Sequence, residues 1–220
     1  MARPFTRSLV PVLLLLLTAG AVPPSVASAA PPSGSPWPAW PSIPPVASYD
    51  IAVTLIPQTH TLSGHEVITY SNRTADAIPN LAFHLYLNAF RSGDTIFMRE
   101  SAGVGSLSRP DPSHPGWTEV DTLRLAGRVD LLPSTTISET LMWTILPQPL
   151  GPGETLTLTL DFHALLPAII ARTGFAGDFT MAGQWFPKLA VYQEGKGWNA
   201  HDFHANSEFF ADFGSYNVAI

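Results

Sequence analysis

The chain has 220 residues, of which 45% are hydrophobic and 13% are charged, and it contains no cysteine. This apolar share can support a packed core and argues against global disorder. The formal net charge is −6, without a basic stretch, which argues against a nucleic-acid partner because such binding depends on neutralising phosphates. The lack of cysteine excludes a disulfide scaffold, a thiolate zinc site and a cysteine nucleophile.

The first 29 residues have the three parts of a secretory signal peptide. Arg3 and Arg7 precede an apolar run from Leu9 to Val22, and small residues at 27–29 form a cleavage site. The run is shorter than the roughly 20 residues that a membrane-spanning helix needs, so we expect no stable membrane anchor. The sequence predicts an exported protein: secreted, periplasmic or on the cell surface. Residues 30–47 are uncharged and rich in proline, which opposes strand pairing, and they predict an extended tether.

Strand patterns recur through the remaining domain, residues 48–220. They are alternating or β-rich stretches at 48–55, 61–70, 81–86, 120–125, 140–145, 155–160 and 216–220. Gly64 predicts a bulge or a point of close approach. Residues 91–117 lack clean periodicity and predict a surface loop or a pair of short turns. Because no amphipathic helix separates the strands, we expect a mainly β fold with little helix, an antiparallel β-sandwich or curved sheet.

The last fifth of the chain differs in composition, because residues 175–216 hold 11 of the aromatic side chains. Such density is hard to bury in one strand layer and predicts an interface with something larger. The chain then stops inside a new alternating stretch, so we expect a truncated chain for which Ile220 is not the natural end.

Catalytic signatures such as G-x-S-x-G, the P-loop and G-x-G-x-x-G do not occur in the sequence. His65-Glu66 begins like a zinc helix motif but lacks the second histidine, and we interpret it as a polar pair on the outer face of a strand. The best metal-like pattern is His201, Asp202 and His204 with Glu208, since positions 201, 204 and 208 would share one face of a helix. Histidines that hydrogen-bond to neighbouring carboxylates or backbone are the alternative.

Two further kinds of site remain open. A carboxylate pair for glycosidic chemistry could come from Asp161, Asp178, Asp202, Glu208 and Asp212, although solvated loop residues explain them as well. Clustered Trp and Tyr side chains near polar residues could form a platform that stacks on sugars, and the alternative is packing between domains.

Several stretches resemble, in order, the N-terminal domain of aminopeptidase N-type zinc metallopeptidases, the gluzincin aminopeptidases. They are Tyr49–Leu55 with Pro57–Gly64, Leu81–Phe90, Gly183–Tyr192, and Trp198, His201 and His204 followed by Glu208–Val218. The resemblance implies a large saddle-like β-domain that packs on a thermolysin-like catalytic domain downstream. The family's His-Glu-x-x-His zinc helix and Gly-x-Met-Glu-Asn-type strand are both missing here. Zinc is therefore expected in the full-length enzyme and not in this chain, in which we expect no catalytic residue, no metal ligand and no peptidase activity.

The resemblance also suggests one substrate-binding residue. It implies that the N-terminal domain walls the substrate cleft, and Gln184 lies in the matching region; a loop glutamine that bonds to backbone is the alternative. Peptides would be the partner, through the missing catalytic domain. The implied function is that of the N-terminal, non-catalytic domain of an exported zinc metallopeptidase that removes N-terminal residues from peptides. The alternative is a secreted β-sandwich module that binds carbohydrate or protein and has no enzymatic activity.

Overall fold

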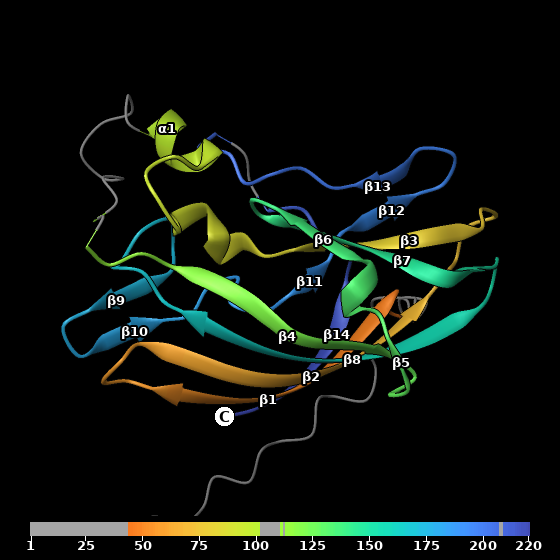
Figure 1. Cartoon of the computed structure of the whole chain (residues 1–220), viewed down its shortest axis with the longest axis horizontal. Coiled ribbons are helices and arrows are strands. Elements are labelled where there is room, and N and C mark those ends of the chain that lie inside the picture. Colours follow the sequence, from red (N-terminus) through yellow and green to blue (C-terminus); the bar gives the residue numbers. More distant parts are fainter. Residues whose placement is uncertain (1–43, 102–110, 112, 207–208) are drawn as a thin grey trace, which may run out of the picture. The chain divides into compact units, whose positions relative to one another are not determined.

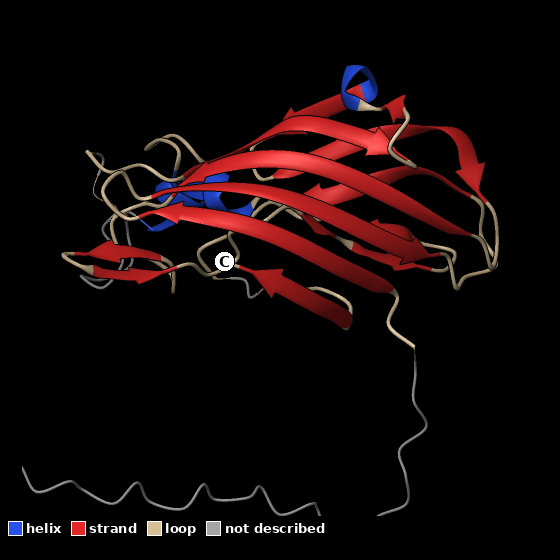
Figure 2. Cartoon of the chain, turned by 90° about the horizontal axis from the view of Figure 1, so that it is seen from below, coloured by secondary structure: helices blue, strands red, loops and turns tan. Residues whose placement is uncertain are grey.

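The computed structural model describes residues 44–101, 111, 113–206 and 209–220, and these form a mainly β domain (Figures 1 and 2). The predicted signal peptide lies outside the described residues, as does most of the predicted tether. The last tether residue, Ala47, is already the first residue of strand β1. The predicted fold class, mainly β with little helix, is confirmed.

The larger sheet has six strands in the order β14-β1-β2-β8-β4-β5. Their bounds are β1 Ala47–Ile56, β2 Thr61–Ser71, β4 Trp117–Leu125, β5 Val129–Asp130, β8 Thr155–Leu165 and β14 Gly214–Ala219. Neighbouring strands are antiparallel except β1 and β14, which run parallel. The expected antiparallel arrangement holds for every other pair of neighbouring strands among the described residues, and this edge is the exception. A tight hairpin forces two strands to run in opposite directions, and no hairpin joins β14 to β1.

The smaller sheet has four strands in the order β11-β3-β7-β6. The bounds are β3 Ile78–His84, β6 Thr135–Ser138, β7 Leu141–Leu150 and β11 Lys188–Leu189. Two separate ribbons pair β9 Gly174–Ala176 with β10 Phe179–Met181, and β12 Val191–Gln193 with β13 Gly197–Asn199. The helical pieces among the described residues are short: the 3₁₀ helices η1 Tyr86–Phe90 and η2 Leu132–Ser134, and α1 Ile96–Ser101.

A single apolar core joins the two sheets, which lie as layers in Figure 2. Alternate residues of β2 and β8 point into it, as the period-two pattern of the sequence predicts. Ile68 and Leu160 from the larger sheet belong to the same cluster as Phe83 and Met142 from the smaller sheet, and all four are buried. The described residues thus form a β-sandwich whose core lies between its two main sheets.

Gly64 shows the predicted close approach but no bulge. It lies directly opposite Phe162 in the register of β2 and β8. A Cβ atom at position 64 would lie 2.4 Å from the Cζ atom of the Phe162 ring, well inside van der Waals contact. The glycine therefore makes room for a large core side chain from the neighbouring strand.

Two expectations for residues 81–117 are wrong. Residues 81–86 do not alternate between core and solvent, because all six are buried. Tyr86 belongs to the same core cluster as Leu81 and Phe83, because Phe203 from the C-terminal part of the chain packs against its ring. The expected loop at 91–117 contains helix α1, which buries Phe97 and Met98; residues 102–110 and 112 lie outside the described set.

The aromatic residues of the last fifth serve the domain's own packing to a large extent. Of the 11 side chains, Phe203 is buried, six are half-buried, and four are exposed: Phe179, Phe210, Phe213 and Tyr216. Phe203 stacks against Phe97 at 5.0 Å and against Phe209 at 4.9 Å between ring centroids. The aromatic density is thus not mainly an uncovered interface, and a partner for the exposed members stays a prediction.

Candidate functional site

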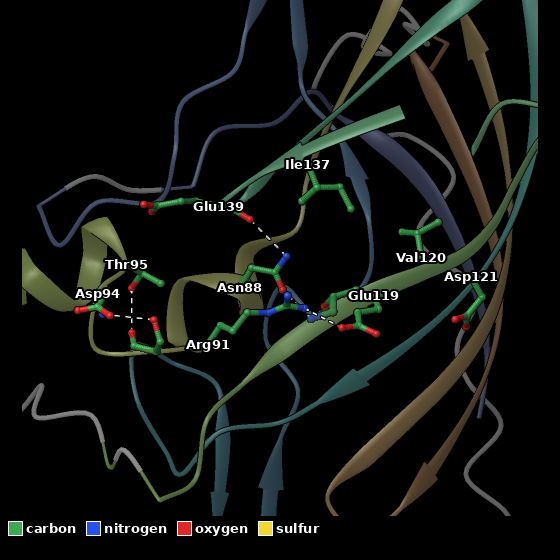
Figure 3. A pocket seen from close by; sticks show the side chains of 11 residues that line it. Asn88, Arg91, Asp94, Thr95, Glu119, Val120, Asp121, Ile137 and Glu139 are labelled. Carbon is green, nitrogen blue, oxygen red and sulfur yellow. Dashed lines mark hydrogen bonds and ion pairs between the residues drawn. The ribbon is translucent and has the colours of Figure 1, made fainter. Parts of the chain in front are cut away.

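A polar cavity of about 610 Å³ lies between η1, β4 and the turn before β7 (Figure 3). Its side chains bond mainly to one another or to nearby backbone. Asn88 donates to the Glu139 carbonyl at 3.3 Å and accepts from the Thr118 backbone N–H at 2.8 Å. Arg91 pairs with Glu119 at 3.1 Å. These bonds tie η1 to β4 and to the turn before β7, so we interpret this network as structural.

A second cavity, of about 250 Å³, contains the one substrate-binding residue that the sequence analysis singled out. Gln184 lies at its wall, and the aromatic rings of Tyr86, Phe203 and Phe209 line much of the rest. The Gln184 side chain is half-buried, and no described residue hydrogen-bonds to its amide. The alternative from the sequence, an amide that bonds to backbone, is therefore not what the described part of the chain shows.

The backbone around this Gln184 cavity is strained. Ala171, Arg172 and Gln184 all line the cavity and have positive φ angles of 44°, 69° and 52°. Ala171 and Arg172 are the two central residues of the turn between Ile170 and Thr173, whose backbones hydrogen-bond to each other, and such two-residue turns require positive φ. Gln184 lies outside that turn, and a positive φ at a non-glycine residue costs of order 1–3 kcal/mol. Thr173 holds the geometry here, because its hydroxyl donates to the Met181 carbonyl at 3.3 Å and accepts from the Gly183 N–H at 3.1 Å.

The metal-like pattern at 201–208 does not form on a helix. Residues 201–204 have no regular secondary structure, and Glu208 lies outside the described residues. Asp202 Oδ1 accepts from the backbone N–H and the hydroxyl of Thr140, at 3.0 and 2.8 Å, and His204 Nδ1 lies 2.8 Å from Glu100 Oε1. The hydrogen-bonded alternative therefore holds for Asp202 and His204, while His201 is exposed.

The residues present do not fit a zinc ion. Over the described ranges, no group of three or more His, Cys, Asp or Glu side chains is arranged to hold a metal. Zinc needs three or four such ligands converging on one point. Within the described ranges no such set exists, so we assign zinc no step here.

The interpretation of His65-Glu66 is right for one residue and wrong for the other. His65 lies on the outer face of β2, with Nδ1 2.6 Å from Asp161 Oδ1. This bond, with a second from the Thr122 hydroxyl, lowers the pKa of Asp161. Glu66 points inward and is 0% exposed, with no hydrogen-bond partner for either carboxylate oxygen. Burial raises its pKa well above the usual range. Strand parity could have found this, because Glu66 is in phase with the apolar residues Leu62 and Ile68.

The other candidate carboxylates lie on separate elements. Asp161 belongs to β8 and pairs with His65, while Asp178 lies in the exposed turn between β9 and β10. Asp202 is bonded to Thr140. Asp212 is half-buried just before β14, and this burial raises its pKa. Each of these four described carboxylates thus has its own surroundings, and Glu208, the fifth candidate, lies outside the described residues.

Comparison with known proteins finds similar solved structures only. No protein-family model matches the sequence, and no curated protein matches it. A mutant M1 zinc metallopeptidase from Deinococcus radiodurans, bound to a Tyr-Ser-Ala substrate, is 15% identical with a TM-score of 0.40, over 78% of this chain and 32% of that one. A two-domain M1 zinc metallopeptidase mutant bound to L-tryptophan is 18% identical with a TM-score of 0.36, over 55% of this chain and 21% of that one. This chain thus spans less than a third of the length of either structure.

No helix within the described part of the chain is long and apolar enough to cross a bilayer.

Proposed function

We propose that this chain is the N-terminal, non-catalytic β-domain of an exported zinc metallopeptidase that removes N-terminal residues from peptides. In this proposal, residues 1–29 are the export signal, residues 30–47 are a tether, and residues 48–220 form the domain that walls the substrate cleft. Zinc and the catalytic residues belong to a further domain that follows in the full-length protein. The peptide substrate reaches this chain through that domain, and neither nucleic acid nor a membrane anchor is involved.

One observation carries the proposal: three stretches that resemble the peptidase family meet at the Gln184 cavity. Leu81–Phe90 contributes Tyr86, Gly183–Tyr192 contributes Gln184, and Glu208–Val218 contributes Phe209. The first stretch ends at Phe90 and the second begins at Gly183, so the cavity brings together parts of the chain that are distant in the sequence. The strained backbone at Gln184 supports a functional role for the same place.

The proposal is tested by expressing the reading frame with its downstream sequence, beside the 220-residue chain alone. We expect the longer protein to contain a His-Glu-x-x-His helix and to hydrolyse aminoacyl-anilides, with activity lost on chelation and restored by zinc. We expect the 220-residue chain to be inactive. Chelator-sensitive hydrolysis by the short chain, or a longer frame without zinc ligands, would contradict the proposal.

In the longer enzyme, Gln184→Ala should lower kcat/KM about tenfold, because it removes one neutral hydrogen bond to the substrate. Alanine bears the same positive φ as glutamine, so the free energy of unfolding should change little. Steady-state kinetics and urea unfolding check both expectations. Gln58→Ala, which truncates an exposed glutamine in the turn after β1, is the matched control and should leave kcat/KM unchanged. Equal kinetics for the two variants would remove Gln184 from the substrate site.

A further inference from the structure

A third cavity, of about 280 Å³, lies beside the Gln184 cavity and differs from it in chemistry. It is lined by residues from the end of β3, from β13 and from the segment that follows β13. The lining includes His84, Asn199, His201 and Asp202, together with the ring of Phe210. We call it the His84 cavity. Polar groups and an aromatic ring thus border one small space.

His84 is the feature that points to a ligand. The residue is 3% exposed, yet neither ring nitrogen has a hydrogen-bond partner. The ring stacks on Tyr86 with centroids 4.5 Å apart and planes inclined by 6°, which fixes its orientation. A buried polar atom without a partner costs about 1–3 kcal/mol, and native structures leave few of them. His84 is one of the residues that line the cavity, so a ligand bound there would supply the partner that its nitrogens lack.

His84 offers one donor and one acceptor. Burial, with smaller contributions from His201 and Lys188, lowers its pKa to about 4 against the opposing effect of Asp202, so the imidazole is neutral at pH 7. A neutral imidazole donates from one nitrogen and accepts at the other. A ligand that matches it must itself both accept and donate.

The polar side chains beside His84 also match a ligand that both donates and accepts hydrogen bonds. The Asn199 amide donates and accepts, and the structure gives no side-chain partner to it within the described residues. Asp202 uses Oδ1 for Thr140 and keeps its second oxygen as an acceptor. Thr140 is 1% exposed and also accepts from the Phe203 N–H at 2.9 Å, so this wall is anchored in the core. The cavity thus presents both hydrogen-bond donors and hydrogen-bond acceptors. The Asp202 carboxylate disfavours the binding of an anion.

Hydroxyl groups are both donors and acceptors, and a sugar ring carries several of them around an apolar face. Phe210, which is 48% exposed, offers an aromatic surface on which such a face can stack. The volume of about 280 Å³ lies just under the range of roughly 300–1,000 Å³ typical of pockets for drug-sized ligands, which suits one small ring. A metal does not suit it, because the described residues form no set of three metal ligands.

We propose that the His84 cavity binds a neutral monosaccharide unit, whose hydroxyls hydrogen-bond with His84, Asn199 and Asp202 and whose apolar face lies on Phe210. This binding site is separate from the Gln184 cavity and does not rest on the proposed peptidase function. It can be tested on the 220-residue chain alone, so its failure and the failure of the peptidase proposal are distinguishable.

The test is NMR titration of the protein, made with isotope-labelled histidine, against the methyl glycosides of glucose, galactose and mannose. We expect at least one glycoside to shift the His84 ring signals saturably. Phe210→Ala and Asn199→Ala should each weaken its affinity about tenfold. Phe213→Ala is the matched control, because Phe213 is 96% exposed and does not line the cavity, and it should leave the affinity unchanged.

Melting curves of the three variants establish that each remains folded before it is titrated. The proposal is overturned if none of the glycosides shifts the His84 signals saturably. It is also overturned if the glycoside binds Phe210→Ala and Asn199→Ala as tightly as the unmodified chain, since binding would then lie elsewhere. A saturable response of His84 to zinc, without one to any glycoside, would replace the sugar site with a metal site.

Discussion

Glu66→Met is expected to raise the free energy of unfolding at pH 8 by about 2 kcal/mol. Glu66 is 0% exposed, and both its carboxylate oxygens lack partners. Methionine has a similar length and no polar atom to bury, so the variant removes the cost without leaving a cavity. Urea unfolding of both chains at several pH values measures the difference.

The difference should grow as the pH rises. Burial raises the pKa of Glu66 above that of a free glutamate, about 4.3, so the folded chain keeps a proton that the unfolded chain releases. Stability from this group is therefore complete below about pH 4.3 and is lost as the pH rises toward the raised pKa, at up to about 1.4 kcal/mol per pH unit. Other groups titrate in both chains and cancel in the comparison.

Glu66→Gln separates ionisation from polarity. The amide cannot ionise, so the stability gain of this variant over the unmodified chain should grow with pH as that of Glu66→Met does. The amide is still a buried polar group, so the gain should be smaller than for Glu66→Met. A difference between the methionine variant and the unmodified chain that stays constant between pH 5 and 8 would show that Glu66 does not titrate there as its burial requires.

Gly174→Ala is expected to destabilise the domain by about 3 kcal/mol. Gly174 opens β9 with a φ of +115°, and a Cβ atom there would lie 2.4 Å from the Pro167 carbonyl oxygen. A backbone carbonyl cannot move away as the end of a flexible side chain can. The clash with Pro167 therefore adds to the free-energy cost of placing alanine at a positive φ. The shift in the midpoint of urea unfolding measures the loss.

Gly177→Ala is the matched control, in the turn between β9 and β10. Gly177 also has a positive φ, +57°, but a Cβ atom there would meet nothing within 4 Å. This variant should cost only the conformational part, about 1 kcal/mol. If both variants lost the same free energy of unfolding, the close approach to the Pro167 carbonyl oxygen would contribute nothing to the effect of Gly174→Ala.

The strands were predictable from the sequence where one face meets the core and the other meets solvent. Thr155–Leu160 alternates strictly, and β8 places its leucines in the core as that pattern requires. Gly64 could be recognised as a point of close approach, because glycine inside a strand pattern leaves room for a neighbour. In both cases the local pattern contains the physical cause of the structure.

The sequence pattern did not predict burial correctly where packing between distant parts of the chain determines it. The sequence of residues 81–86 predicts alternation, but all six are buried, and Phe203, more than a hundred residues later, packs against Tyr86. Glu66 read as an outer-face residue because a charged side chain favours solvent, yet strand parity places it inside. The Gln184 cavity was predictable only as a region, since its walls come from distant stretches. His84 lacks hydrogen-bond partners because of how all the residues around it pack. The sequence next to His84 therefore does not predict this.

The parallel pairing of β1 with β14 has a consequence for the order of folding. Ser48 and Ser215 are paired across this edge and lie 167 residues apart in the chain. Closing so long a loop is slow, and parallel pairing between distant segments is slower than hairpin formation. The antiparallel strands β1, β2, β8 and β4 can pair without β14, so β14 is expected to dock last. Until it does, Tyr49 lacks its stacking partner Tyr216, and one edge of β1 stays open to pairing with other chains.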